Sequence, residues 1–112
     1  MDFTGKVAIV TGAGQGVGKG IALALSSYNA NIALLGRTLS KVQAVADEIN
    51  LNGGSAIAIE CDVKDVSAIQ SAIDATVNKF SSIDFLVNNA QEVPLGNLLH
   101  VDDQAFENGW MS

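Results

Sequence analysis

Glycine occupies every second position from residue 12 to residue 20 of the stretch TGAGQGVGKG. A glycine inside a helix costs about 1 kcal/mol relative to alanine, so a run of this density needs a structural or chemical reason. The run follows residues 7–10, a short β-branched segment typical of a buried strand, and precedes apolar residues at helical spacing. Because the start of a helix is partially positive and offers backbone N–H groups, a glycine-rich turn at this point is suited to holding a phosphate.

Several cofactor patterns can be compared with the spacing of these glycines. The fingerprint G-x-G-x-x-G fails in every register, because its last glycine would fall on Val17, Lys19 or Ile21. The P-loop pattern G-x-x-x-x-G-K-[ST] fails because it needs glycine at position 13 and a hydroxyl at position 20. The G-x-G-x-G pattern of S-adenosylmethionine-dependent methyltransferases fits positions 12, 14 and 16 and stays an alternative, although the acidic residues that usually accompany it are absent.

A fourth pattern, T-G-x-x-x-G-x-G, fits the stretch without a gap. The matching residues are Thr11, Gly12, Gly16 and Gly18. Two further motifs follow in order, each after an apolar segment: Asp62-Val63 and Asn88-Asn89-Ala90. With these three motifs the whole chain resembles the short-chain dehydrogenase/reductase family. It departs from the family pattern at Gln91, where the family usually has glycine.

The resemblance implies a dinucleotide-binding site. The residues assigned to it are Gly12, Gln15, Gly16, Val17, Gly18, Arg37, Thr38, Asp62, Val63, Asn89 and Ala90. The glycine turn would hold the pyrophosphate, and Gly18 would let the first helix pack closely on the sheet. The Asp62 carboxylate would accept a hydrogen bond from the adenine amino group; the alternative is that Asp62 only caps the turn before Val66. Asn89 would lie beside the nicotinamide ribose. Gly14 is expected to be a permissive loop position, and Gly20 has no assigned role.

Arg37 and Thr38 follow the second apolar segment, about 20 residues after the glycine turn. In dinucleotide folds an acidic residue here binds the ribose 2′-hydroxyl, whereas an arginine accommodates a 2′-phosphate. No acid stands at this point, so we expect NADP(H) to be preferred over NAD(H). NADP-preferring relatives often have a second basic residue in the glycine loop, where this chain has Gln15. The alternative for Arg37 is a solvated surface charge.

Four apolar segments, at residues 7–10, 32–35, 56–59 and 85–87, predict strands, with helical patterns between them. This alternation predicts right-handed βαβ units. The expected fold class is α/β: a Rossmann-type doubly wound parallel sheet with strand order 3-2-1-4. No linker or composition shift divides the chain, so residues 1–112 are expected to be the N-terminal part of a single domain.

The helical patterns also predict faces and caps. Asp65 is expected to cap the third helix, and Ser40 with Gln43 has the spacing of a capping box at the second. The residues expected along one face of the first helix are Val17, Ile21, Ala24, Leu25 and Tyr28.

The family's catalytic serine and its Y-x-x-x-K motif cannot be assigned in these 112 residues. The only tyrosine is Tyr28, and Ile32 stands four positions later. We therefore expect the cofactor-binding half of an oxidoreductase that transfers a hydride between a nicotinamide and a small alcohol or carbonyl substrate. By resemblance, the complete protein is expected to form a homo-oligomer. A truncated or non-catalytic dinucleotide-binding fragment is the alternative.

Composition narrows the classes of partner. The formal net charge is −6, which argues against nucleic acid and anionic membrane surfaces as partners. No run approaches the 18 apolar residues of a membrane span. Cys61 is the single cysteine, so no internal disulfide can form, and a buried reduced thiol is expected. These features predict a cytoplasmic protein.

Overall fold

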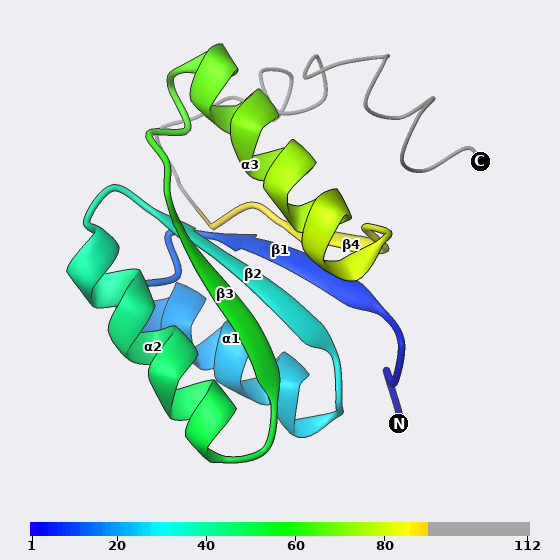
Figure 1. The fold of residues 1–112 in the computed structure, drawn as a ribbon. Coiled ribbons are helices and arrows are strands. Elements are labelled where there is room, and N and C mark those ends of the chain that lie inside the picture. The colour runs from blue at the N-terminus through cyan, green and yellow to red at the C-terminus, as the bar shows by residue number, and fades with distance from the viewer. Residues whose placement is uncertain (90–112) are drawn as a thin grey trace.

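The computed structural model describes residues 1–89, so the predictions for Ala90 and Gln91 lie outside the described residues. The strands and helices alternate along this range, as Figure 1 shows. They are β1 (Val7–Thr11), α1 (Gly16–Ser27), β2 (Asn31–Gly36), α2 (Leu39–Leu51), β3 (Ser55–Glu60), α3 (Val66–Phe80) and β4 (Phe85–Val87). The strands form one parallel sheet in the order β3-β2-β1-β4, which confirms the predicted fold class and strand order.

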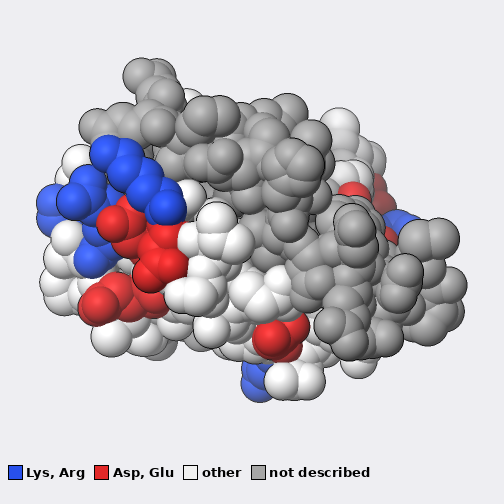
Figure 2. Space-filling view, turned by 90° about the horizontal axis from the view of Figure 1, so that it is seen from above, with Lys and Arg blue, Asp and Glu red and all other residues white. Residues whose placement is uncertain are grey.

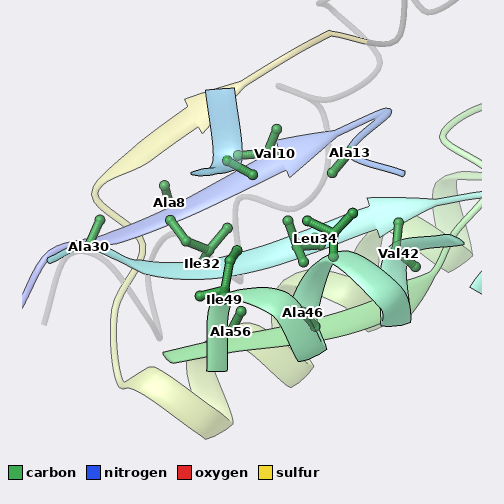
Figure 3. Close-up of a cluster of buried hydrophobic side chains, with 12 residues drawn as sticks. Ala8, Val10, Ala13, Ala30, Ile32, Leu34, Val42, Ala46, Ile49 and Ala56 are labelled. Atoms are coloured by element: carbon green, nitrogen blue, oxygen red, sulfur yellow. The ribbon is translucent and has the colours of Figure 1, made fainter. Parts of the chain in front are cut away.

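Helices cover both faces of the sheet, with α1 and α2 on one side and α3 on the other (Figure 1). Successive residues of a strand point to opposite faces, and β2 supplies both cores in this way. Ile32 and Leu34 belong to the cluster under α1 and α2, whereas Leu35 belongs to the cluster under α3. Figure 3 shows the first cluster, with Ile32 and Leu34 alongside residues of α2. Burial on both faces explains why the strands are continuous apolar runs.

Of the apolar residues that recur at helical spacing in α1, Leu25 packs against the core, but Val17 and Tyr28 do not lie on the buried side. Val17 is 69% exposed and Tyr28 is 41% exposed, whereas the fully enclosed positions of this helix are Gly18 and Ala22. The cause is the close approach of α1 to the glycine turn. Because a Cβ on Gly18 would lie only 2.1 Å from the carbonyl oxygen of Gly12, no side chain fits between the first turn of α1 and the glycine turn at this position.

Of the two predicted helix caps, one is confirmed and the other is wrong. The Asp65 carboxylate accepts hydrogen bonds from the backbone N–H groups of Ser67 and Ala68, which confirms the cap. The Ser67 hydroxyl also donates to this carboxylate, and this bond together with the two backbone bonds holds the pKa of Asp65 below its usual value. The second helix instead begins after Thr38, and Gln43 donates to Asp47 rather than closing a capping box with Ser40. None of the helices in residues 1–89 is both long and apolar enough to cross a membrane.

Candidate nucleotide-binding site

A cavity of about 520 Å³ opens at the carboxyl ends of the strands, between the glycine loop, the ends of β2 and β3, and the first turn of α2. Five of the predicted site residues line it: Gly12, Gln15, Arg37, Thr38 and Val63. Six more lining residues were not among the predicted ones: Gly14, Leu35, Gly36, Lys41, Val42 and Cys61. The structure therefore brings the glycine loop and the Arg37-Thr38 pair to one cavity, although more than 20 residues separate them in sequence.

Backbone geometry explains two of the glycines. Gly12 has φ +60° and Gly16 has φ +59°, in the left-handed region that favours glycine. The first position turns the chain sharply off β1, and the second begins α1. A residue with a side chain would be strained at either position.

Gly14 is not the permissive position that was expected. A Cβ on this residue would lie 2.9 Å from Cβ of Lys41, so the loop and the first turn of α2 approach too closely for a side chain. Gly36 is similarly confined, because its Cβ would lie 2.7 Å from Cγ1 of Val42. By contrast, a Cβ on Gly20 would meet nothing within 4 Å, so close packing does not explain the glycine at this position.

The residues that precede α1 and α2 leave the starts of both helices without a side-chain cap. They are Gln15 and Thr38, and both line the cavity. The first N–H groups of a helix have no acceptor within the helix itself. The start of α3, by contrast, is capped by Asp65, and no residue of α3 lines this cavity. The uncapped starts of α1 and α2 make the cavity suitable for an anionic ligand.

Thr11 joins the glycine loop to the end of β4. The backbone N–H of Asn89 donates to Thr11 Oγ1 at 2.9 Å, and the Thr11 hydroxyl has the Val87 carbonyl oxygen as an acceptor at 3.4 Å. Asn89 Nδ2 also lies 3.5 Å from the Gly12 carbonyl oxygen. Thr11 is completely buried, so these bonds fix Asn89 next to the glycine turn, although 77 positions separate Asn89 from Gly12.

Arg37 and Lys41 give the cavity two cationic side chains. Both are exposed, and both line it. Lys41 Nζ donates to Gln15 Oε1 at 3.0 Å and so links α2 to the glycine loop. Lys41 was not among the residues predicted from the sequence. The one signal in the sequence is that Lys41 follows Arg37 by only four residues, which places it on the first turn of the next helix.

The remaining predicted residues lie around this cavity rather than in its lining. The Asp62 carboxylate accepts a hydrogen bond from the Lys64 backbone N–H at 3.0 Å, so it also shapes the turn after β3. Gly16 and Val17 are exposed at the start of α1, and Gly18 is buried beneath them. Burial raises the pKa of the Cys61 thiol to about 11, with the carboxylates of Asp62 and Asp65 contributing, which keeps it protonated near neutral pH.

Charged side chains are unevenly distributed over the molecule. In the view from above (Figure 2), Lys and Arg side chains gather at the left, directly beside Asp and Glu side chains. Positive and negative side chains therefore lie side by side on this face of a chain whose formal net charge is −6. Residues 1–89 hold no group of three or more His, Cys, Asp or Glu side chains that could bind a metal ion.

Comparison with known proteins agrees with this arrangement. The family model for short chain dehydrogenases matches residues 6–110. The chain therefore belongs to the short-chain dehydrogenase family. It is similar to oxidoreductase UcpA of Salmonella typhimurium, with 38% identity over 102 residues that cover 91% of this chain and 38% of that protein. The chain thus spans about two fifths of the length of this relative.

Two similar solved structures carry a nicotinamide cofactor. One is a metagenomic short-chain oxidoreductase in complex with NADP, with a TM-score of 0.79 and 29% identity, covering 93% of this chain and 57% of that one. The other is a short-chain dehydrogenase/reductase from Burkholderia phymatum in complex with NAD, with a TM-score of 0.74 and 28% identity, covering 77% and 31%. Because both cofactors occur among the relatives, the preference of this chain must be argued from its own residues.

Proposed function

We propose that this chain forms the NADP(H)-binding half of a short-chain oxidoreductase. The observation that carries the proposal is the cavity shared by the glycine loop and the Arg37-Thr38 pair, with no acidic residue at the end of β2. The cavity has the charge, the uncapped helix starts and the space that a phosphorylated ligand needs. When bound, NADP(H) supplies the hydride donor or acceptor.

Different parts of the cavity would hold different parts of the cofactor. N–H groups at Gln15, Gly16 and Val17 would bind the pyrophosphate, because α1 begins there without a cap. The Arg37 guanidinium can form paired, charge-assisted hydrogen bonds to the 2′-phosphate, and the Thr38 hydroxyl can add another.

The other assigned residues would bind the adenine and nicotinamide ends of the cofactor. Asp62 and Val63 would border the adenine, beside the floor of the cavity at the end of β3. Asn89 would border the nicotinamide ribose, in the place where the Thr11 hydrogen bond fixes it. The family resemblance assigns Ala90 to the same end.

The complete protein, in this proposal, acts on a small alcohol or carbonyl compound and is a cytoplasmic homo-oligomer. Residues 1–112 belong to its single dinucleotide-binding domain. The test is a fluorescence titration of the complete protein with NADPH, followed by a screen of carbonyl compounds for NADPH oxidation. Saturable binding with turnover is the expected result. Binding without turnover on a broad panel would favour a non-catalytic dinucleotide-binding protein, and binding of S-adenosylmethionine in place of NADPH would overturn the proposal.

Replacing Thr11 by valine tests the link between the glycine turn and Asn89. The side chains have nearly the same shape, but the Asn89 N–H loses its acceptor. We expect a loss of about 1 kcal/mol in the free energy of unfolding, measured by urea denaturation, and weaker NADPH binding. The matched control is Thr76→Val, which removes an equally buried hydroxyl whose bond is to Ala72 within α3. That control should leave NADPH affinity unchanged. Unchanged affinity in Thr11→Val as well would show that Asn89 needs no such support.

A further inference from the structure

Lys41 stands closer to the glycine loop than its place in the sequence suggests. It lies on the first turn of α2, and its Cβ would be 2.9 Å from a Cβ placed on Gly14. Cβ of Lys41 therefore lies directly beside the glycine loop. From this position Lys41 lines the same cavity as Arg37.

The head of the side chain is also positioned. Lys41 Nζ donates to Gln15 Oε1 at 3.0 Å, a bond that joins residues 26 positions apart. An ammonium group has three N–H donors and no acceptor, so the bond to Gln15 leaves two donors for another partner. Gln15 carries no charge and does not neutralise the ammonium. A cationic donor is thus held at the edge of a cavity that already contains a guanidinium.

Lys19 provides a contrast within the same region of the chain. It lies on α1, only four positions after Gln15, but its Nζ is 3.7 Å from Glu48 Oε1 and it does not line the cavity. Lys19 thus has an acidic partner on α2. Of these two lysines, only Lys41 combines cavity lining with a neutral partner.

We infer that Lys41 is a specificity-determining residue that binds the 2′-phosphate of NADP(H) together with Arg37, and that Gln15 positions its ammonium group. The inference rests on the proposed NADP(H) function. It supplies, from α2, the second cation that the glycine loop lacks at Gln15. A doubly charged phosphate can accept charge-assisted hydrogen bonds from both side chains. The 2′-hydroxyl of NAD(H) carries no charge, so a second cation adds little to its binding.

The test measures the dissociation constants of NADPH and NADH for the complete protein and its variants in the same buffer. Lys41→Gln is expected to weaken NADPH binding about tenfold and to change NADH binding less than twofold. Lys41→Arg keeps the charge and should retain most of the preference. Gln15→Leu should weaken NADPH binding about threefold, and should have no further effect when combined with Lys41→Gln, because its role is exerted through Lys41.

Lys19→Gln is the matched control, since it removes the same charge from the neighbouring helix and should leave both constants unchanged. Retained NADH affinity in each variant shows that the fold is intact. If the wild type prefers NADPH and Arg37→Gln loses that preference while Lys41→Gln behaves like Lys19→Gln, the inference is overturned and the proposed function stands. If the wild type binds NADH as tightly as NADPH, the proposed cofactor preference fails and the inference fails with it.

Discussion

Replacing Arg37 by aspartate should weaken NADPH binding by about 100-fold and leave NADH binding unchanged or slightly improved. The change removes a guanidinium that can form two parallel hydrogen bonds to a phosphate and puts a negative charge in its place. The same carboxylate can accept a hydrogen bond from the ribose 2′-hydroxyl of NADH, as acidic residues at this position do in dinucleotide folds. The ratio of the two dissociation constants, measured by fluorescence titration, is the informative quantity.

The control for this reversal is Lys79→Asp, which makes the same change of charge on the last turn of α3, outside the cavity lining. It should alter the two affinities equally and only slightly, because exposed charges at a distance are screened by salt. Equal weakening of NADPH and NADH by Arg37→Asp would mean that Arg37 is a solvated surface charge, and the NADP(H) assignment would then be lost.

Gly18→Ala should destabilise the fold by about 3 kcal/mol and abolish measurable cofactor binding. The new methyl carbon would lie 2.1 Å from the Gly12 carbonyl oxygen and 2.8 Å from Asn89 Nδ2. The first of these neighbours is backbone and cannot move without displacing the turn. The start of α1 must therefore shift away from β1, which removes the N–H groups from the place where a pyrophosphate would bind. Urea denaturation and NADPH titration measure the two effects separately.

Gly20→Ala is the matched control for Gly18→Ala. It makes the same change in the same helix, two residues further on, where a Cβ meets nothing within 4 Å. Alanine is a better helix former than glycine, so this variant should be more stable than the wild type by about 1 kcal/mol, with normal NADPH affinity. Similar losses in the two variants would rule out close packing as the reason for glycine at position 18.

The topology could be predicted from the sequence because its signals are local. Each strand is a short apolar run such as residues 32–35, and the parallel order follows from the alternation of such runs with helical patterns. The spacing of the glycines showed which of them match the T-G-x-x-x-G-x-G pattern. The left-handed conformations of Gly12 and Gly16 agree with that match. The cap at Asp65 was also a local signal, since it needs only the two N–H groups that follow.

The errors concern contacts between distant segments. Apolar periodicity assumes that large residues mark the buried face, whereas α1 buries Gly18 and Ala22 because the helix lies so close to the turn. The restriction on Gly14 depends on Lys41, which comes from a different βα unit. Lys41 itself could not be assigned from its charge, because its role depends on the approach of α2 to Gln15. Such approaches are set by how the helices pack on the sheet.

The ratio of the NADPH and NADH dissociation constants of the wild-type complete protein, measured by isothermal titration calorimetry in one buffer, tests the proposed site most directly. With Arg37 and Lys41 at the cavity and no acidic residue at the end of β2, NADPH is expected to bind at least about tenfold more tightly than NADH. The difference should shrink as salt concentration rises, because it depends on charge. Equal affinities, or tighter binding of NADH, would contradict the assignment of this cavity to NADP(H).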